Sequence, residues 1–245
     1  MALGPHTQAS PESLPTTAAV ARLLAGLVVL MAVLGPINVL VTDVQLFAID
    51  SELKAGPNLM VLVSGAVLFV AAALALRVAG SDLAGSPTPW ALMAFLFAFI
   101  GVDELVTIHE HLEVSAGISW QLIYLPVTLA GAALWWILFI RLRARDELLA
   151  AGWVIAAGCW AIAQFLEALH WGANVGHTVP GVEKAFPATE ELSELIGSCL
   201  FLLVTLALLE SGRRLRYRAP PPSGVARRRA AQDPGSPAPS ASAPP

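Results

Sequence analysis

Six stretches of this chain carry no charged residue, and most of them are long enough to cross a lipid bilayer as a helix, which takes about 20 residues. They are Leu23–Thr42, Ala55–Leu76, Leu83–Val102, Val114–Ile140, Leu148–Leu166 and Leu195–Leu209, the last reaching that length only with the glutamates that precede it. Only 13% of the residues are charged, well below the roughly 25% of a typical soluble domain. Because a backbone in lipid must satisfy its own hydrogen bonds, the sequence predicts an all-α polytopic membrane helix bundle with six transmembrane helices.

The basic residues predict the orientation of this bundle. Twelve of the fourteen lysines and arginines lie before the first stretch, after the second, fourth and sixth, or in the C-terminal tail, and only Lys54 and Lys184 lie on the other side. Since segments rich in Lys and Arg stay inside, we expect a multi-pass protein of the plasma membrane with both termini in the cytoplasm. The basic residues then line the inner edge of the lipid bilayer and do not indicate a nucleic-acid partner.

Both ends of the chain have the composition of flexible segments. Residues 1–18 are mostly polar or small, and residues 219–245 are rich in Pro, Ala and Ser, which predicts a disordered cytoplasmic tail. Residues 19–218 are the predicted transmembrane domain. Cys159 and Cys199 fall within the fifth and sixth stretches, where we expect packing thiols and no disulfide.

The third stretch ends in acidic and histidine residues. Asp103 and Glu104 lie about 15 residues into the predicted helix, or roughly 22 Å along it, which places them in the outer third of the membrane. Charged groups at that depth are costly and usually functional. On a continuous helix Glu104 shares a face with His111, whereas His109 lies on a different face. The alternative for the two histidines is a solvated helix end.

The fifth stretch ends in a polar stripe on an otherwise apolar helix. Gln164, Glu167 and His170 follow one another at intervals of three residues. The Glu-x-x-His spacing puts a carboxylate and an imidazole on adjacent turns, as in di-iron and di-manganese helical bundles. The alternative is a hydrogen-bonded Glu–His pair at the membrane interface.

The sixth stretch opens with Glu190, Glu191 and Glu194. The helix dipole favours acidic residues at a helix N-terminus, which accounts for Glu190 and Glu191 without a function. Glu194 lies a turn deeper, and carboxylates this close repel one another unless a proton, a cation or a basic group lies between them. No Lys or Arg occurs in the outer halves of the stretches. The compensating charge must therefore come from histidine, protons or a metal ion.

Together these residues predict one outward-facing site with oxygen and imidazole donors, a set that suits iron, manganese or zinc. The candidate metal ligands are Asp103, Glu104, His109, Glu167, His170, Glu191 and Glu194. Tyr124, Gln121 and Ser64 are candidates for hydrogen bonds to these ligands. Trp90 and Trp120, near the ends of stretches, are predicted to be interfacial anchors.

Two short sequence motifs resemble those of a known group of proteins. The third stretch ends in Asp103-Glu104-x4-His109-Glu110, and the sixth opens with Glu190-Glu191-x2-Glu194-x2-Gly197. Both motifs resemble those of a group of uncharacterised bacterial six-helix integral membrane proteins, and the segment from Glu52 to Asn58 is similar as well. The resemblance covers most of the membrane part and implies the six-helix fold, but it implies no known reaction.

These patterns leave two functions open. We expect a metal-dependent oxidoreductase or hydrolase that acts on a lipid, a quinone-like molecule or another membrane-soluble substrate. The alternative is a proton- or cation-coupled transporter or channel that uses the same carboxylates. The inner halves of the stretches are almost wholly apolar, which favours an enzyme or binding protein over a transporter that needs a polar path. A haem between His109 or His111 and His170 is disfavoured by the surrounding carboxylates.

Overall fold

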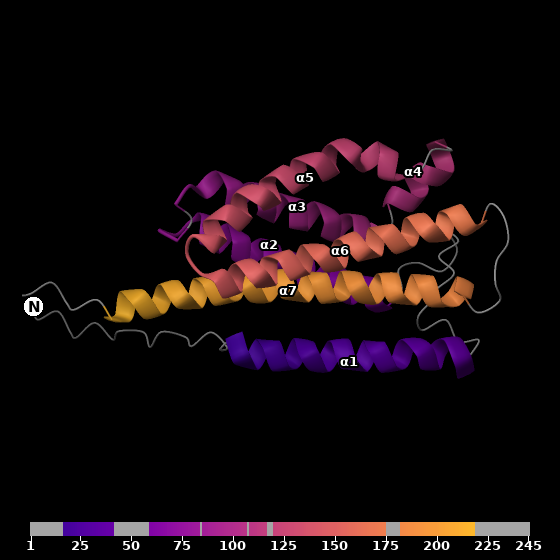
Figure 1. The fold of residues 1–245 in the computed structure, drawn as a ribbon, viewed down its shortest axis with the longest axis horizontal. Helices are drawn as coiled ribbons and strands as arrows, with labels where there is room; N and C mark the ends of the chain where they lie inside the picture. Colours follow the sequence, from indigo (N-terminus) through magenta and orange to yellow (C-terminus); the bar gives the residue numbers. More distant parts are fainter. Residues whose placement is uncertain are drawn as a thin grey trace, which may run out of the picture. The chain divides into compact units, whose positions relative to one another are not determined.

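The computed structural model describes residues 17–41, 59–83, 85–106, 108–116, 120–174 and 182–218. Within these ranges the regular structure is entirely α-helical (Figure 1). The seven described helices are α1 (Thr17–Val41), α2 (Leu59–Ala79), α3 (Pro87–Val106), α4 (Ile108–Ala116), α5 (Trp120–Arg143), α6 (Glu147–Asn174) and α7 (Val182–Arg218).

Six of these helices, all except the short α4, are long and apolar enough to cross a membrane. The mean hydropathy of their spans runs from 1.7 to 2.7, and each span is at least 18 residues long. The predicted all-α bundle with six potential spans is therefore confirmed, and the chain is a multi-pass membrane protein. The sequence predicts one helix continuing past Asp103, whereas the structure has a separate short helix, α4, after Val106.

Residues 1–210 form one compact unit and residues 211–245 a second one. Of the second unit the structure describes residues 211–218, which are the last residues of α7. The predicted flexible N-terminus lies almost wholly outside the described residues, and the predicted disordered tail lies wholly outside them.

The interior of the first unit is built mainly from aromatic and aliphatic side chains of α2, α3, α6 and α7, with two residues each from α1 and α5. The Trp153 ring lies edge-on to Phe201, with centroids 4.7 Å apart, and Phe97 lies 5.2 Å from Phe201. Trp90 is 2% exposed and lies 5.9 Å from Trp153. The prediction that Trp90 is an interfacial anchor is therefore wrong, because its ring packs into the core between α3 and α6.

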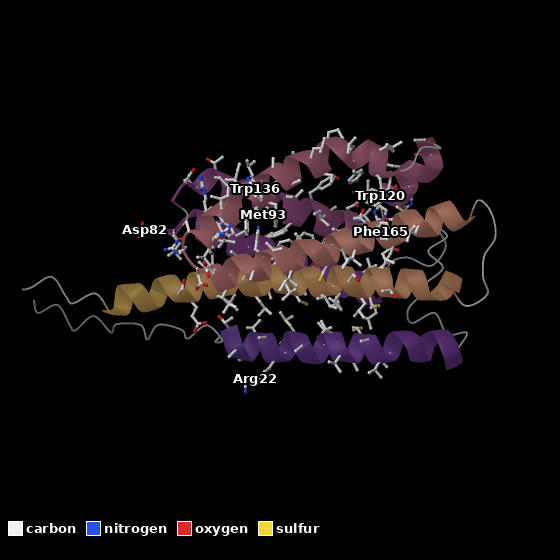
Figure 2. All side chains as sticks on the ribbon, in the orientation of Figure 1. Arg22, Asp82, Met93, Trp120, Trp136 and Phe165 are labelled. Atoms are coloured by element: carbon white, nitrogen blue, oxygen red, sulfur yellow. The ribbon has the colours of Figure 1, made fainter. Side chains whose placement is uncertain are left out.

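Helix α5 shows the opposite pattern, with large apolar side chains exposed along most of its length. Leu122, Leu129 and Trp136 are all more than half exposed, and Figure 2 shows Trp136 on this helix. Only Leu138 and Leu142 of α5 are buried. An apolar helix that exposes this much surface is expected where the solvent is lipid, since lipid tails are as apolar as the side chains.

Two close helix crossings lie about one turn from the acidic residues. A Cβ added to Gly101 on α3 would lie 3.2 Å from the Gly65 carbonyl oxygen on α2. A Cβ added to Gly197 on α7 would lie 2.5 Å from Trp160 Cδ1 and 2.9 Å from the Ala156 carbonyl oxygen on α6. The absence of a side chain at each glycine thus lets the two helix backbones approach closely. This contact helps to set the position, along the helix axis, of the acidic residue next to each glycine.

The turns at the opposite end of the first unit are held by side chains. Arg145 Nη1 donates to the Leu83 carbonyl oxygen at 2.7 Å, and Arg141 Nη1 donates to that of Ser86 at 3.3 Å. Asp146 accepts hydrogen bonds from two backbone N–H groups in the first turn of α6 and so caps that helix. Figure 2 shows Asp82 at this end and Trp120 at the other.

Candidate carboxylate–histidine site

A break in the helix brings His109 back onto Asp103. Helix α3 ends at Val106 and α4 begins at Ile108. The His109 backbone N–H donates to Asp103 Oδ1 at 3.1 Å, and its Nδ1 lies 2.8 Å from Asp103 Oδ2. On a continuous helix, residues six apart are separated by roughly 9 Å along the axis and lie on different faces. The prediction that His109 points away from Asp103 is therefore wrong, because it assumed an unbroken helix.

Asp103 is 6% exposed, and each of its carboxylate oxygens is engaged in hydrogen bonding with the protein. Besides the two bonds from His109, the Tyr124 hydroxyl donates to Asp103 Oδ1 at 2.9 Å. Tyr124, predicted to bond to one of the ligands, thus does so from helix α5. Asp103 both caps α4 and orients the imidazole of His109.

The pKa of His109 reflects two opposing effects. Burial disfavours the charged imidazolium and by itself would lower the pKa. The hydrogen bond to Asp103 and the negative charges of Asp103, Glu104 and Glu167 outweigh burial and raise the pKa from 6.5 to about 9. Without a metal ion, a pKa in this range favours a protonated His109, which would supply part of the positive charge that the sequence requires; a metal ion bound at Nε2 would take the place of that proton. Because Nδ1 is engaged by Asp103, Nε2 is the imidazole nitrogen left for other partners.

Trp120, the first residue of α5, connects three helices at this site. Its Nε1 donates a hydrogen bond to Glu167 Oε1 on α6. Its ring lies 5.0 Å from the His109 ring on α4 and 5.5 Å from that of Tyr124. The prediction of an interfacial anchor missed this role. The available signal was the position of Trp120 at the same outer end of its stretch as the acidic residues.

Five glutamates from α3, α6 and α7 lie near this end of the unit, and three of them, Glu104, Glu167 and Glu190, interact electrostatically with His109. Glu104 and Glu194 are each 7% exposed, and Gln164 Nε2 lies 3.4 Å from Glu194 Oε1. The five are close enough to act on one another's charge, namely Glu104, Glu167, Glu190, Glu191 and Glu194. The structure therefore gathers six of the seven predicted ligands, together with Glu190, at one end of the first unit.

The other residues that the sequence singled out lie away from this cluster or have side chains outside the described part of the structure. The side chains of His170 and Glu110 are not among those the structure describes, and His111 is exposed on α4. Ser64 hydrogen-bonds with Ser198 at 3.3 Å in the core. Cys159 and Cys199 are free thiols, as predicted. Among the described side chains, no three of His, Cys, Asp or Glu are already placed to hold one metal ion.

Fold and cluster together define a multi-pass helical membrane protein with a buried acidic–histidine site at one end of its bundle. Residues 17–209 match the family described as Domain of unknown function (DUF8692), and the chain belongs to this family. The match extends over all of the helices from α1 to α6 and most of α7. Comparison with curated proteins gives no match, and comparison with solved structures gives none either.

Proposed function

We propose that the carboxylate–histidine cluster faces the outside of the cell from the plasma membrane and that both termini are cytoplasmic. Support comes from the sequence, in which twelve of the fourteen basic residues flank the predicted inner ends of the apolar stretches or lie in the C-terminal tail. We also propose that the Asp-Glu-x4-His-Glu and Glu-Glu-x2-Glu-x2-Gly motifs are shared by bacterial members of the family, since both motifs contribute to this one cluster.

We further propose that the protein is a metal-dependent oxidoreductase or hydrolase acting on a membrane-soluble substrate such as a lipid or a quinone. The observation that carries this proposal is the Asp103–His109 pair. A carboxylate that binds one imidazole nitrogen fixes the ring and leaves the other nitrogen to bind a metal ion, an arrangement common in metal sites. Asp103 is thereby a residue that orients a ligand, and His109 Nε2 is the donor.

The glutamates around His109 would complete the metal site. Glu104 from α3 and Glu191 and Glu194 from α7 supply carboxylates, and Glu167 and His170 on α6 complete the predicted set. Carboxylate and imidazole donors suit iron, manganese or zinc. A bound ion of this kind supplies Lewis acidity and a nucleophile at neutral pH. Trp120 holds Glu167, and Gln164 lies beside Glu194, so the carboxylates have partners that orient them.

The apolar interior supports an enzyme over a transporter. Trp153, Phe97 and Phe201 pack against one another in the core, farther along the helices than the cluster. The buried hydroxyls of that core are satisfied locally: Ser64 and Ser198 bond to each other, and Thr205 bonds to the carbonyl of its own helix. A transported ion needs a chain of polar groups, and these residues offer it none.

A proton-binding site, as in a proton-coupled transporter, is the second candidate. It is favoured by the finding that both oxygens of Asp103 are occupied by protein donors, while no three described side chains are placed around one ion. Protons shared between neighbouring carboxyl groups would then offset the repulsion.

Metal analysis of the purified full chain tests the proposal. The wild type, purified without chelators, should contain iron, manganese or zinc, and Glu194→Gln should lower the content because it removes an anionic ligand. Glu210→Gln is the matched control, since Glu210 lies on the same helix at the other end and binds Thr17 of α1. A wild type that is metal-free and takes up none of these ions would overturn the metal proposal. In that case Glu194→Gln, which mimics a protonated acid, should preserve or raise thermal stability.

A further inference from the structure

We propose that the arginines at the C-terminal end of α7 bind the phosphate groups of anionic phospholipids. This segment is a different part of α7 from Glu190, Glu191 and Glu194, and its role does not depend on the reaction proposed for them. Three features carry the proposal: the position of the arginines just past the apolar span, the charge of the segment, and the use of arginine in place of lysine.

Helix α7 does not end where its apolar span ends. The span stops at Gly212, whereas the helix continues to Arg218. With a rise of about 1.5 Å per residue, residues 213–218 lie about 1.5–9 Å beyond the end of the span along the helix axis. The headgroup layer on each side of the hydrocarbon core is about 5–8 Å thick. The end of α7 is therefore at the depth of the lipid phosphates.

This end of α7 is strongly basic. Four of its last six residues are arginines, namely Arg213, Arg214, Arg216 and Arg218. The nearest acidic residue before them is Glu210, which accepts hydrogen bonds from the backbone N–H and the hydroxyl of Thr17 on α1. Even with Glu210 included, residues 210–218 carry four positive charges and only one negative charge. The segment therefore attracts anions at the surface of the membrane.

The basic residues of the chain are divided by type. All twelve arginines flank the same predicted ends of the apolar stretches or lie in the C-terminal tail, and both lysines, Lys54 and Lys184, flank the opposite ends. Orientation in the membrane requires only positive charge, which lysine supplies as well as arginine. Arginine differs because its planar guanidinium binds a phosphate through two parallel hydrogen bonds. The use of arginine alone at these ends indicates recognition of phosphate in addition to orientation.

Position and charge together select the lipid as the ligand. The arginines begin one residue past the span, so the phosphate of a neighbouring lipid is the anion closest to them. A zwitterionic lipid also carries an ammonium group, which repels a guanidinium, whereas an anionic lipid such as phosphatidylglycerol does not. Each basic residue near an anionic membrane surface strengthens binding by about fivefold. We therefore expect a preference for anionic over zwitterionic phospholipids.

Native mass spectrometry of the full chain in detergent, titrated with phosphatidylglycerol or phosphatidylcholine, tests the proposal. The wild type should bind phosphatidylglycerol with the lower Kd. Replacement of all four arginines of the segment by glutamine should raise this Kd about fivefold or more and leave that for phosphatidylcholine unchanged. Replacement of the same four by lysine keeps the charge and should still weaken the binding of phosphatidylglycerol. Arg22→Gln, at an exposed position on α1, is the control and should behave as the wild type.

The outcomes separate phosphate recognition from charge and from other partners. Equal Kd values for the two lipids in the wild type overturn the proposal, and this comparison does not depend on the folding of a variant. Full affinity in the lysine variant also overturns it, because charge alone would then attract the lipid. A wild type that binds a single-stranded DNA oligonucleotide and shows no preference for phosphatidylglycerol would assign the segment to nucleic acid and overturn the proposal as well.

Discussion

Replacing Gly197 by alanine adds a single methyl group where, among the described glycines, an added Cβ would meet its closest neighbour. That group would lie 2.5 Å from Trp160 Cδ1 and 2.9 Å from the Ala156 carbonyl oxygen, both well inside normal contact distance. The carbonyl belongs to the backbone of α6, so it cannot rotate away, and α6 and α7 must move apart. Overpacking of this kind typically costs about 1–3 kcal/mol. Removing a glycine from a helix returns about 0.5–1 kcal/mol, which leaves a net loss of up to about 2.5 kcal/mol.

Gly158→Ala provides the matched control. Gly158 lies on α6, and a Cβ at this position meets nothing within 4 Å. The control should therefore be unchanged or more stable by up to about 1 kcal/mol, because only the helix propensity changes. For a domain of this size, 1 kcal/mol corresponds to a shift in Tm of about 2–4 °C. We expect Gly197→Ala to unfold several degrees below wild type and Gly158→Ala at or above it.

Thermal unfolding of the purified protein in detergent, followed by tryptophan fluorescence, measures this difference. Because Glu194 lies one turn from Gly197 on α7, Gly197→Ala should also lower the metal content of the protein. If Gly197→Ala and Gly158→Ala prove equally stable, the two helices do not cross at Gly197. The positioning of Glu194 by that crossing would then be refuted as well.

Three further predictions concern the orientation and the site. In a background without the native cysteines, a cysteine at Ser86 should resist membrane-impermeant labelling of intact cells, and labelling from outside would reverse the orientation. In chelator-treated protein, the raised pKa of His109 means that its protonated imidazole stabilises the folded state. This contribution to the free energy of unfolding should be complete below about pH 6.5 and lost as the pH rises through about 9. Asp103→Asn should remove this loss, as measured by unfolding at each pH together with imidazole NMR. Trp120→Phe keeps a ring beside the imidazole but loses the hydrogen bond to the α6 glutamate, and should weaken metal binding ~10–100-fold in equilibrium dialysis.

The sequence alone was sufficient for the architecture. An uncharged stretch of membrane length predicts a transmembrane helix directly. The free energy of moving each residue into lipid depends on that residue alone, and each backbone hydrogen bond of a helix joins residues only four apart. For the same reason the grouping of acidic residues at matching ends of three stretches indicated one site. Glu104, Glu167 and Glu194 are close enough to interact electrostatically, since helices that cross the same layer bring residues of equal depth together.

Only the tertiary structure decided how the site is organised. The break between α3 and α4 leaves no trace in the hydropathy pattern, yet it turns His109 onto Asp103. Trp90 and Trp120 look alike at the ends of stretches, but one packs into the core and the other bonds to a glutamate. Such contacts join residues that are distant along the chain or separated by a turn. Their free energy depends on which helix faces meet, and that is set by packing rather than by any local property of the sequence.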